Sequence, residues 1–155
     1  MPLQLYEREQ VLEACLTVFA RHGYTGTSTG MLAEAAGISK ALIFHHFKSK
    51  KHLYFSLLEY CFEKAGKELR MDTISEQEDF FEAVDRLSRL KFDYYRKFPD
   101  EYKLAYDAFY STPDELKEEL ERKYGHVMAA RNEVLERLFG RVPRGKRWAV
   151  NRLSS

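Results

Sequence analysis

The residues best suited to chemistry with a partner are the cations and imidazoles gathered between positions 35 and 58. This stretch has no acidic residue and contains four lysines and three histidines: Lys40, Lys48, Lys50, Lys51, His45, His46 and His52. Residues 61–139 instead carry 14 lysines and arginines against 19 acidic residues. The net charge of +1 is therefore the sum of a basic segment, residues 35–58, and a larger acidic segment, residues 61–139, with the remaining residues. Such polarity favours contact with a phosphate backbone through one end of the molecule.

The elements that must position these groups are helices, because hydrophobic residues recur at spacings of three and four and no strand-like alternation occurs. The expected helices cover residues 7–22, 29–36, 40–47, 50–70, 76–98, 100–110 and 113–139. We predict an all-α fold: a three-helix helix-turn-helix head (residues 1–48), a helical regulatory body for ligand binding and dimerisation (residues 49–140) and a basic tail (residues 141–155).

The head has the local signals of a helix-turn-helix. Ser28 and Ser39 can each cap the helix that follows, and Gly37 can adopt the left-handed conformation that ends the helix before it. Ile38 can fill the corner between the two helices. Two short helices joined by a glycine-containing turn present the second helix to the major groove of DNA.

The run from Glu9 to Leu58 resembles the DNA-binding domain of the TetR/AcrR family of transcription regulators. The resemblance rests on several pieces in combination: Phe19, Gly23-Tyr24, Thr27-Ser28-Thr29, residues 33–39 and residues 44–50. It implies a DNA reader fused to a helical body that binds an inducer and pairs two subunits. Its partners would be a near-palindromic double-stranded operator and a second copy of the chain.

Nine residues are the candidate DNA contacts: Thr29, Ser39, Lys40, Ala41, Leu42, Phe44, His45, His46 and Lys50. Thr29 lies at a positive helix N-terminus, a natural phosphate anchor. Lys40 begins the recognition helix, so it can reach guanine or phosphate. Leu42 either contacts a thymine methyl group or is buried.

Two of these positions depart from the family pattern. Ala41 stands where glycine is frequent, and Phe44 stands where a tyrosine commonly holds a phosphate. His45 and His46 can compensate by donating to phosphate. At Lys50 a cation opposes the helix dipole, which suggests a role outside its own helix, and the resemblance implies phosphate binding.

The body is rich in aromatic residues, most of which are expected to be ordinary core. The six chosen as candidate ligand contacts are Tyr60, Phe81, Phe92, Tyr95, Tyr106 and Tyr110. A mostly apolar pocket with a few hydroxyls would suit a small apolar or aromatic effector. We expect such a pocket between the fourth and seventh helices.

Other functions find less support. No nucleophile–base arrangement, glycine-rich phosphate loop or metal-binding motif is visible, so neither an enzyme nor a cofactor is predicted. Cys15 and Cys61 are expected to be buried and reduced. A constitutive or architectural DNA-binding protein without a ligand pocket stays open, and a helical protein-interaction module is disfavoured by the basic reader.

No window is apolar enough to span a membrane and no signal peptide is present, which predicts a cytosolic protein without a membrane partner. The resemblance also implies two further helices after Phe139, whereas residues 140–145 interrupt the helix. A shortened C-terminus is therefore one expectation. In that case the chain dimerises through the helix ending at Phe139 or not at all. The basic tail is either solvated or a nonspecific nucleic-acid contact.

Overall fold

The computed structural model describes residues 5–69, 75 and 77–146, and no strand occurs among them. The helices are α1 (Leu5–His22), α2 (Thr29–Ala36), α3 (Lys40–Phe47), α4 (Lys50–Leu69), α5 (Phe80–Lys97), α6 (Pro99–Tyr110), η1 (Asp114–Leu116), α7 (Lys117–Gly140) and η2 (Arg144–Lys146). The predicted all-α class is confirmed. The end of the expected fourth helix at residue 70, the turn at 72–74 and the tail from 147 onward lie outside the described residues.

The helix-turn-helix forms through the expected caps. The Ser28 hydroxyl accepts the Met31 N–H at 3.2 Å, and the Ser39 hydroxyl accepts the Leu42 N–H at 3.1 Å. Gly37 ends α2 with a φ of 67°, a left-handed conformation that costs glycine little. Both α2 and α3 begin and end at the predicted residues.

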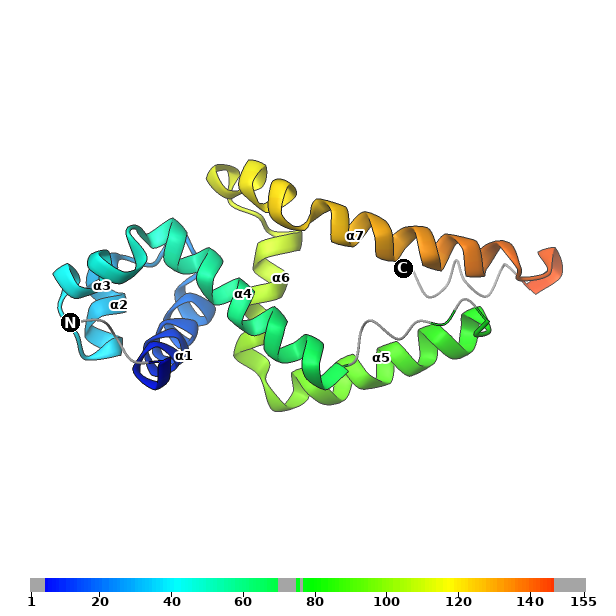
Figure 1. Ribbon diagram of the computed structural model, residues 1–155, viewed down its shortest axis with the longest axis horizontal. Helices are drawn as coiled ribbons and strands as arrows, with labels where there is room; N and C mark the ends of the chain where they lie inside the picture. The colour runs from blue at the N-terminus through cyan, green and yellow to red at the C-terminus, as the bar shows by residue number, and fades with distance from the viewer. Residues whose placement is uncertain (1–4, 70–74, 76, 147–155) are drawn as a thin grey trace.

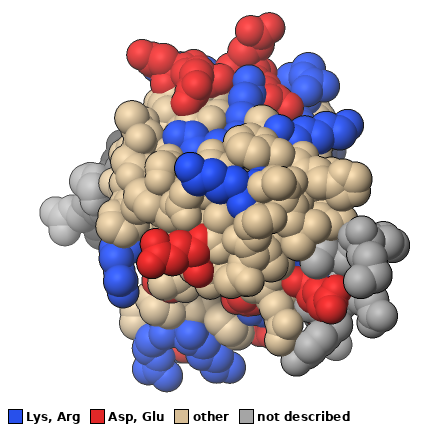
Figure 2. Space-filling model, turned by 90° about the vertical axis from the view of Figure 1, so that its left-hand side faces the viewer, with Lys and Arg blue, Asp and Glu red and all other residues tan. Residues whose placement is uncertain are grey.

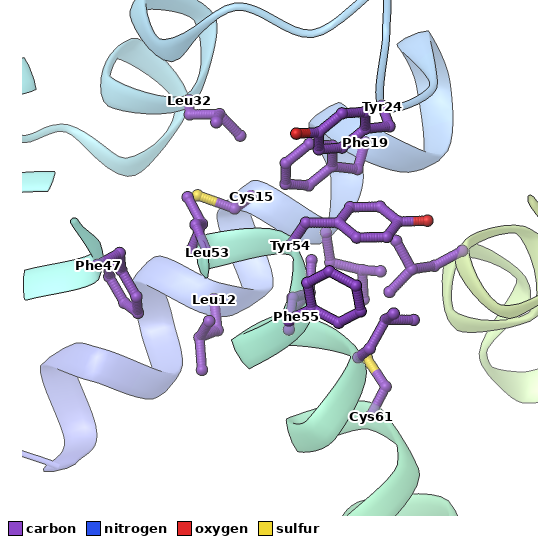
Figure 3. Close-up of a cluster of buried hydrophobic side chains, with 14 of the residues drawn as sticks. Leu12, Cys15, Phe19, Tyr24, Leu32, Phe47, Leu53, Tyr54, Phe55 and Cys61 are labelled. Atoms are coloured by element: carbon purple, nitrogen blue, oxygen red, sulfur yellow. The ribbon is translucent and has the colours of Figure 1, made fainter. Parts of the chain in front are cut away.

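Helix α4 joins the head to the rest of the molecule (Figure 1). It begins beside α3, where Ser49 caps it by accepting the His52 N–H, and it crosses in front of α6. Its buried residues Leu53, Tyr54 and Phe55 lie against side chains of α1 and α2 (Figure 3). The same hydrophobic cluster also includes Leu104 of α6. The division at residue 48 stays a prediction, because one core spans both sides of it.

Helices α5 and α7 extend away from the head and meet again near the far end of the molecule (Figure 1). There Phe80 and Ala83, at the start of α5, pack with Leu138 and Val142, at the end of α7. Between the head and this far-end contact, α6 crosses behind α4 and packs against α1. Both cysteines are buried and free, as predicted.

The body departs from the sequence prediction in several places, and α7 begins at Lys117, after η1, rather than at residue 113. Helix α5 begins at Phe80 rather than at residue 76, because the Asp79 carboxylate accepts the N–H groups of Phe81 and Glu82 and caps the helix there. Leu90 and Val127 have a spacing that fits the apolar faces of these helices, but they are 36% and 56% exposed. They lie in the part of α5 and α7 that is away from the far-end contact. Among the described residues, no helix is long and apolar enough to span a membrane.

Candidate nucleic-acid interface

The first turns of α2 and α3 come together at the exposed end of the head. A Cβ atom placed on Gly30 would lie 3.1 Å from Cε and 3.4 Å from Nζ of Lys40. The ammonium group of Lys40 therefore lies beside Gly30, in the first turn of α2. Helix N-termini carry unpaired N–H groups and a partial positive charge. A lysine beside one makes a corner suited to a phosphate oxygen.

The N-terminal turn of α3 is open to solvent. Ser39, Lys40 and Ala41 are exposed, and Leu42 is half-buried. The Ser39 oxygen accepts the Leu42 N–H, but its own hydroxyl proton stays available for donation. This turn can therefore offer hydroxyl, ammonium and methyl groups to base edges. Ile43 and Phe47, on the opposite face of the helix, are buried and hold α3 in place.

The end of α3 carries the aromatic candidates. Phe44 is 45% exposed, and its ring has no polar group for a phosphate. His45 is exposed and stacks edge-on against His46, with ring centroids 5.0 Å apart. The His46 Nε2 atom is buried without a hydrogen-bond partner among the described residues. Of this pair, only His45 presents its imidazole freely to the surface.

Lys50 occupies a different environment from Lys40. Its Nζ atom donates to the carbonyl oxygens of Tyr24 at 2.9 Å and Thr27 at 3.1 Å. It also lies 4.2 Å from the centre of the Tyr24 ring. The structure thus places the half-buried Lys50 ammonium against the loop between α1 and α2. The spacing of residues gives no signal for this contact, which joins positions 23 and 26 residues apart.

The neighbouring Lys51 forms an ion pair with Glu119 at 3.2 Å. Glu119 is in the first turn of α7, so this pair joins the start of α4 to the body. Viewed from the head end, lysine and arginine side chains lie on the upper and middle part of the face and again at its lower edge, with acidic groups at the top and in the lower half (Figure 2). Basic and acidic groups are therefore both present on this face.

The six candidate ligand contacts do not gather around one cavity. Tyr60 donates to Glu13 of α1 at 2.8 Å, while Phe81 packs on Phe80 at the far end of α5. Phe92 is 67% exposed. Tyr95 of α5 is instead the first of a row of neighbouring aromatic rings that continues along α6. The centroids of successive rings are 5.1 to 6.0 Å apart, in the order Tyr95, Tyr102, Tyr106 and Tyr110.

Two surface hollows occur elsewhere among the described residues. One, of about 270 Å³, lies between the start of α5 and the end of α7, and the other, of about 160 Å³, lies between α1 and the corner that joins α5 to α6. Charged side chains such as Glu78, Arg141 and Glu101 line them. Neither contains any of the six aromatic candidates. The described residues include no cluster of three or more potential metal ligands.

Comparison with known proteins finds a family model that matches the head. Residues 11–57 match the family of bacterial regulatory proteins known as the TetR family. The biofilm operon icaADBC negative transcriptional regulator IcaR of Staphylococcus aureus is 26% identical over 108 residues, which are 70% of this chain and 56% of that protein. The transcriptional repressor AcnR of Corynebacterium glutamicum is 44% identical over 50 residues, which are 32% of this chain and 27% of that protein.

The fold extends the similarity beyond the head. A TetR-like transcriptional regulator from Rhodococcus sp. RHA1 superimposes with a TM-score of 0.67 at 18% identity, covering 90% of this chain and 71% of the other. The chain spans little more than half the length of the IcaR sequences that it matches. The sequence match covers the head, and the structural match covers the helical architecture beyond it. The helix-turn-helix head is thus similar over residues 11–57 to the TetR family of bacterial regulatory proteins.

Proposed function

We propose that the chain is a sequence-specific DNA-binding transcription regulator that represses its target. The observation that supports this most directly is the exposed corner where Lys40, in the open first turn of α3, lies beside Gly30 in the first turn of α2. One part offers charge and N–H groups to a phosphate, and the other offers side chains to base edges. The names of the two curated relatives, a negative regulator and a repressor, support the same direction of control.

The proposed binding unit is a homodimer on a near-palindromic operator. Two recognition helices reach successive major grooves only when their separation matches about one helical turn of DNA, roughly 34 Å. Helix α4 begins in the head and ends beside α5, so a tilt of α4 would change that separation. A ligand that favours the tilted state would release the operator.

The proposed effector is a small, largely apolar or aromatic molecule that binds the body. The support is the supply of aromatic rings on α5 and α6, several of which are exposed. Aromatic rings with hydroxyl tips suit ligands that are mainly apolar with a few polar groups. Competition gel shifts with a panel of such molecules test this step. The effector model fails if every molecule that binds the body leaves operator affinity unchanged.

A constitutive DNA-binding protein is the second candidate. It is favoured by the scatter of the six aromatic candidates over separate parts of the body and by the charged lining of both described hollows. The two candidates differ in a single measurement. A constitutive regulator keeps its operator affinity in the presence of every ligand that raises its unfolding temperature, whereas a sensor loses affinity with at least one of them.

DNA recognition itself is tested by selecting duplexes from a random-sequence pool and measuring affinity against salt concentration. Lys40→Met should reduce the slope of log K against log [salt] by about 0.9, the value for one lost phosphate contact. If Lys40 reads guanine instead, the preference at one base pair should relax as well. Lys67→Met is the matched control, because Lys67 is an exposed lysine at the body end of α4. It should leave both slope and preference unchanged.

A further inference from the structure

Lys50 has an unfavourable place in its own helix. It occupies the first position of α4, where a positive side chain opposes the helix dipole, and the first turn of α4 carries no acidic residue to offset it. The side chain turns back instead, toward the loop between α1 and α2. There it makes two hydrogen bonds and one contact with an aromatic ring.

The ammonium group of Lys50 has three N–H donors. Two point to the carbonyl oxygens of Tyr24 and Thr27, at 2.9 and 3.1 Å. The Tyr24 ring lies 4.2 Å away and adds a cation–π contact. Two of the three donors are therefore engaged within the head, against the loop between α1 and α2.

The loop held by Lys50 is also fixed by contacts of its own residues. The Thr27 hydroxyl donates to the Gly23 carbonyl at 2.6 Å, and the Thr27 side chain is buried. Tyr24 packs against Phe19 and Tyr54, with ring centroids 6.2 and 5.0 Å away (Figure 3). Burial, and then the nearby Glu115 carboxylate, raises the pKa of Tyr24 to about 12.

The loop leads directly into the candidate DNA surface. Thr27 is followed by the cap Ser28, by Thr29, the first residue of α2, and by Gly30, beside which Lys40 lies. On the other side, Lys51 joins the same turn of α4 to Glu119 of α7. One turn of α4 thus contacts the reader through Lys50 and the body through Lys51.

We propose that Lys50 is a positioning residue, which fixes the start of α2 to α4 by holding the Tyr24 and Thr27 carbonyls and does not bind phosphate itself. It makes the α1–α2 loop follow any movement of α4. The position of the Thr29 and Lys40 corner then depends on the body. The inference rests on the proposed function only where it concerns DNA.

The test compares Lys50→Met with Lys51→Met and Lys40→Met in the full chain. Methionine keeps the length and apolar character of the side chain but removes its donors. Loss of charge-assisted bonds to two half-buried carbonyls should lower the unfolding temperature of the DNA-free Lys50→Met protein by about 5 °C. Amide hydrogen exchange at residues 25–29 should become faster. Lys51→Met removes a half-exposed ion pair and should change the unfolding temperature by less than about 2 °C.

Binding to a duplex selected with the unmodified chain separates positioning from contact. Lys50→Met should weaken binding about tenfold at every salt concentration and leave the salt slope unchanged. A slope reduced by about 0.9, as expected for Lys40→Met, identifies Lys50 as a phosphate ligand and overturns the proposal. An unchanged unfolding temperature and unchanged exchange also overturn it.

Failure of the proposed function gives a different pattern. If the unmodified chain selects no duplex, the stability and exchange measurements still decide whether Lys50 holds the loop. Lys50→Gln, which retains two weaker donors, provides a milder variant should the methionine variant not fold. It should show a smaller change of the same kind in both measurements.

Discussion

A buried charged group stands out at the scale of single residues. Glu101 of α6 is only 3% exposed, and its carboxylate accepts hydrogen bonds from Lys64 of α4 at 2.8 Å and from the Tyr94 hydroxyl of α5. The Lys64 ammonium also lies 3.7 Å from the centre of the Phe98 ring. Burial, and then the Glu101 carboxylate, raises the pKa of the Tyr94 phenol far above its usual range. One carboxylate thus joins three helices.

Removing the charge of Glu101 should destabilise the body. Glu101→Gln leaves Lys64 partly buried beside a neutral amide, so we expect the free energy of unfolding to fall by about 2 kcal/mol in urea denaturation. Asp85→Asn is the control, because the Asp85–Arg89 pair on α5 is exposed and worth about 0.5 kcal/mol or less. Equal effects of the two substitutions would show that the buried network contributes nothing beyond a surface pair.

The two thiols predict how stability depends on pH. Burial raises the pKa of Cys15 and Cys61 from 9.0 to about 12. Above pH 9 the unfolded chain therefore releases protons that the folded chain retains, and stability falls as pH rises toward 12. We expect an unfolding temperature that holds up to about pH 8 and then falls. The Cys15→Ala, Cys61→Ala double variant should fall less steeply, and an identical slope would contradict the assignment.

At the scale of elements, the head follows from local signals and the body does not. The bounds of α2 and α3 could be predicted because Ser28, Gly37 and Ser39 begin and end these helices through their own side chains and conformations. The start of α5 could not, because Asp79 caps it within a run of other polar residues. Leu90 is exposed although its spacing fits a helix face. The spacing of apolar residues identifies the apolar face of a helix, but it does not identify the neighbouring element that packs on that face.

The candidate site was predictable to a similar degree. The sequence marked Thr29 and Lys40 separately as DNA contacts, and both stay predictions; that Lys40 lies beside Gly30 in the first turn of α2 comes from the structure. At Lys50 the sequence revealed the unfavourable place in the helix but not the partner. That partner is a pair of backbone carbonyls, and a carbonyl has the same chemistry at every residue. The aromatic candidates could be predicted by type, but their grouping depends on how α5, α6 and α7 pack.

Two glycines give opposite predictions for the elements that they occupy. Gly37 has a φ of 67° and open space where a side chain would begin, so Gly37→Ala should cost about 1 kcal/mol through backbone strain alone. Gly66 lies inside α4 with equally open surroundings, so Gly66→Ala should stabilise the protein by about 1 kcal/mol. Thermal unfolding of both variants checks the signs. A stabilising Gly37→Ala would contradict the left-handed turn between α2 and α3.

At the scale of the whole molecule, charge and architecture point the same way. The basic stretch lies in the head, and acidic residues outnumber basic ones between residues 61 and 139. One end can therefore approach DNA while the body is repelled from it. Helix α4 runs between these two parts and packs against residues of both (Figure 1). A movement of the body can therefore be transmitted to the head through α4.

The most direct test of DNA recognition is equilibrium binding of the full chain to duplexes selected from a random-sequence pool, measured at several salt concentrations. We predict enrichment of a near-palindromic sequence, bound at least about a thousandfold more tightly than unselected duplex. Its affinity should fall as salt rises, with a slope reduced by about 0.9 in Lys40→Met. Absence of any enriched sequence, together with no binding to duplex at low salt, would contradict the proposed function.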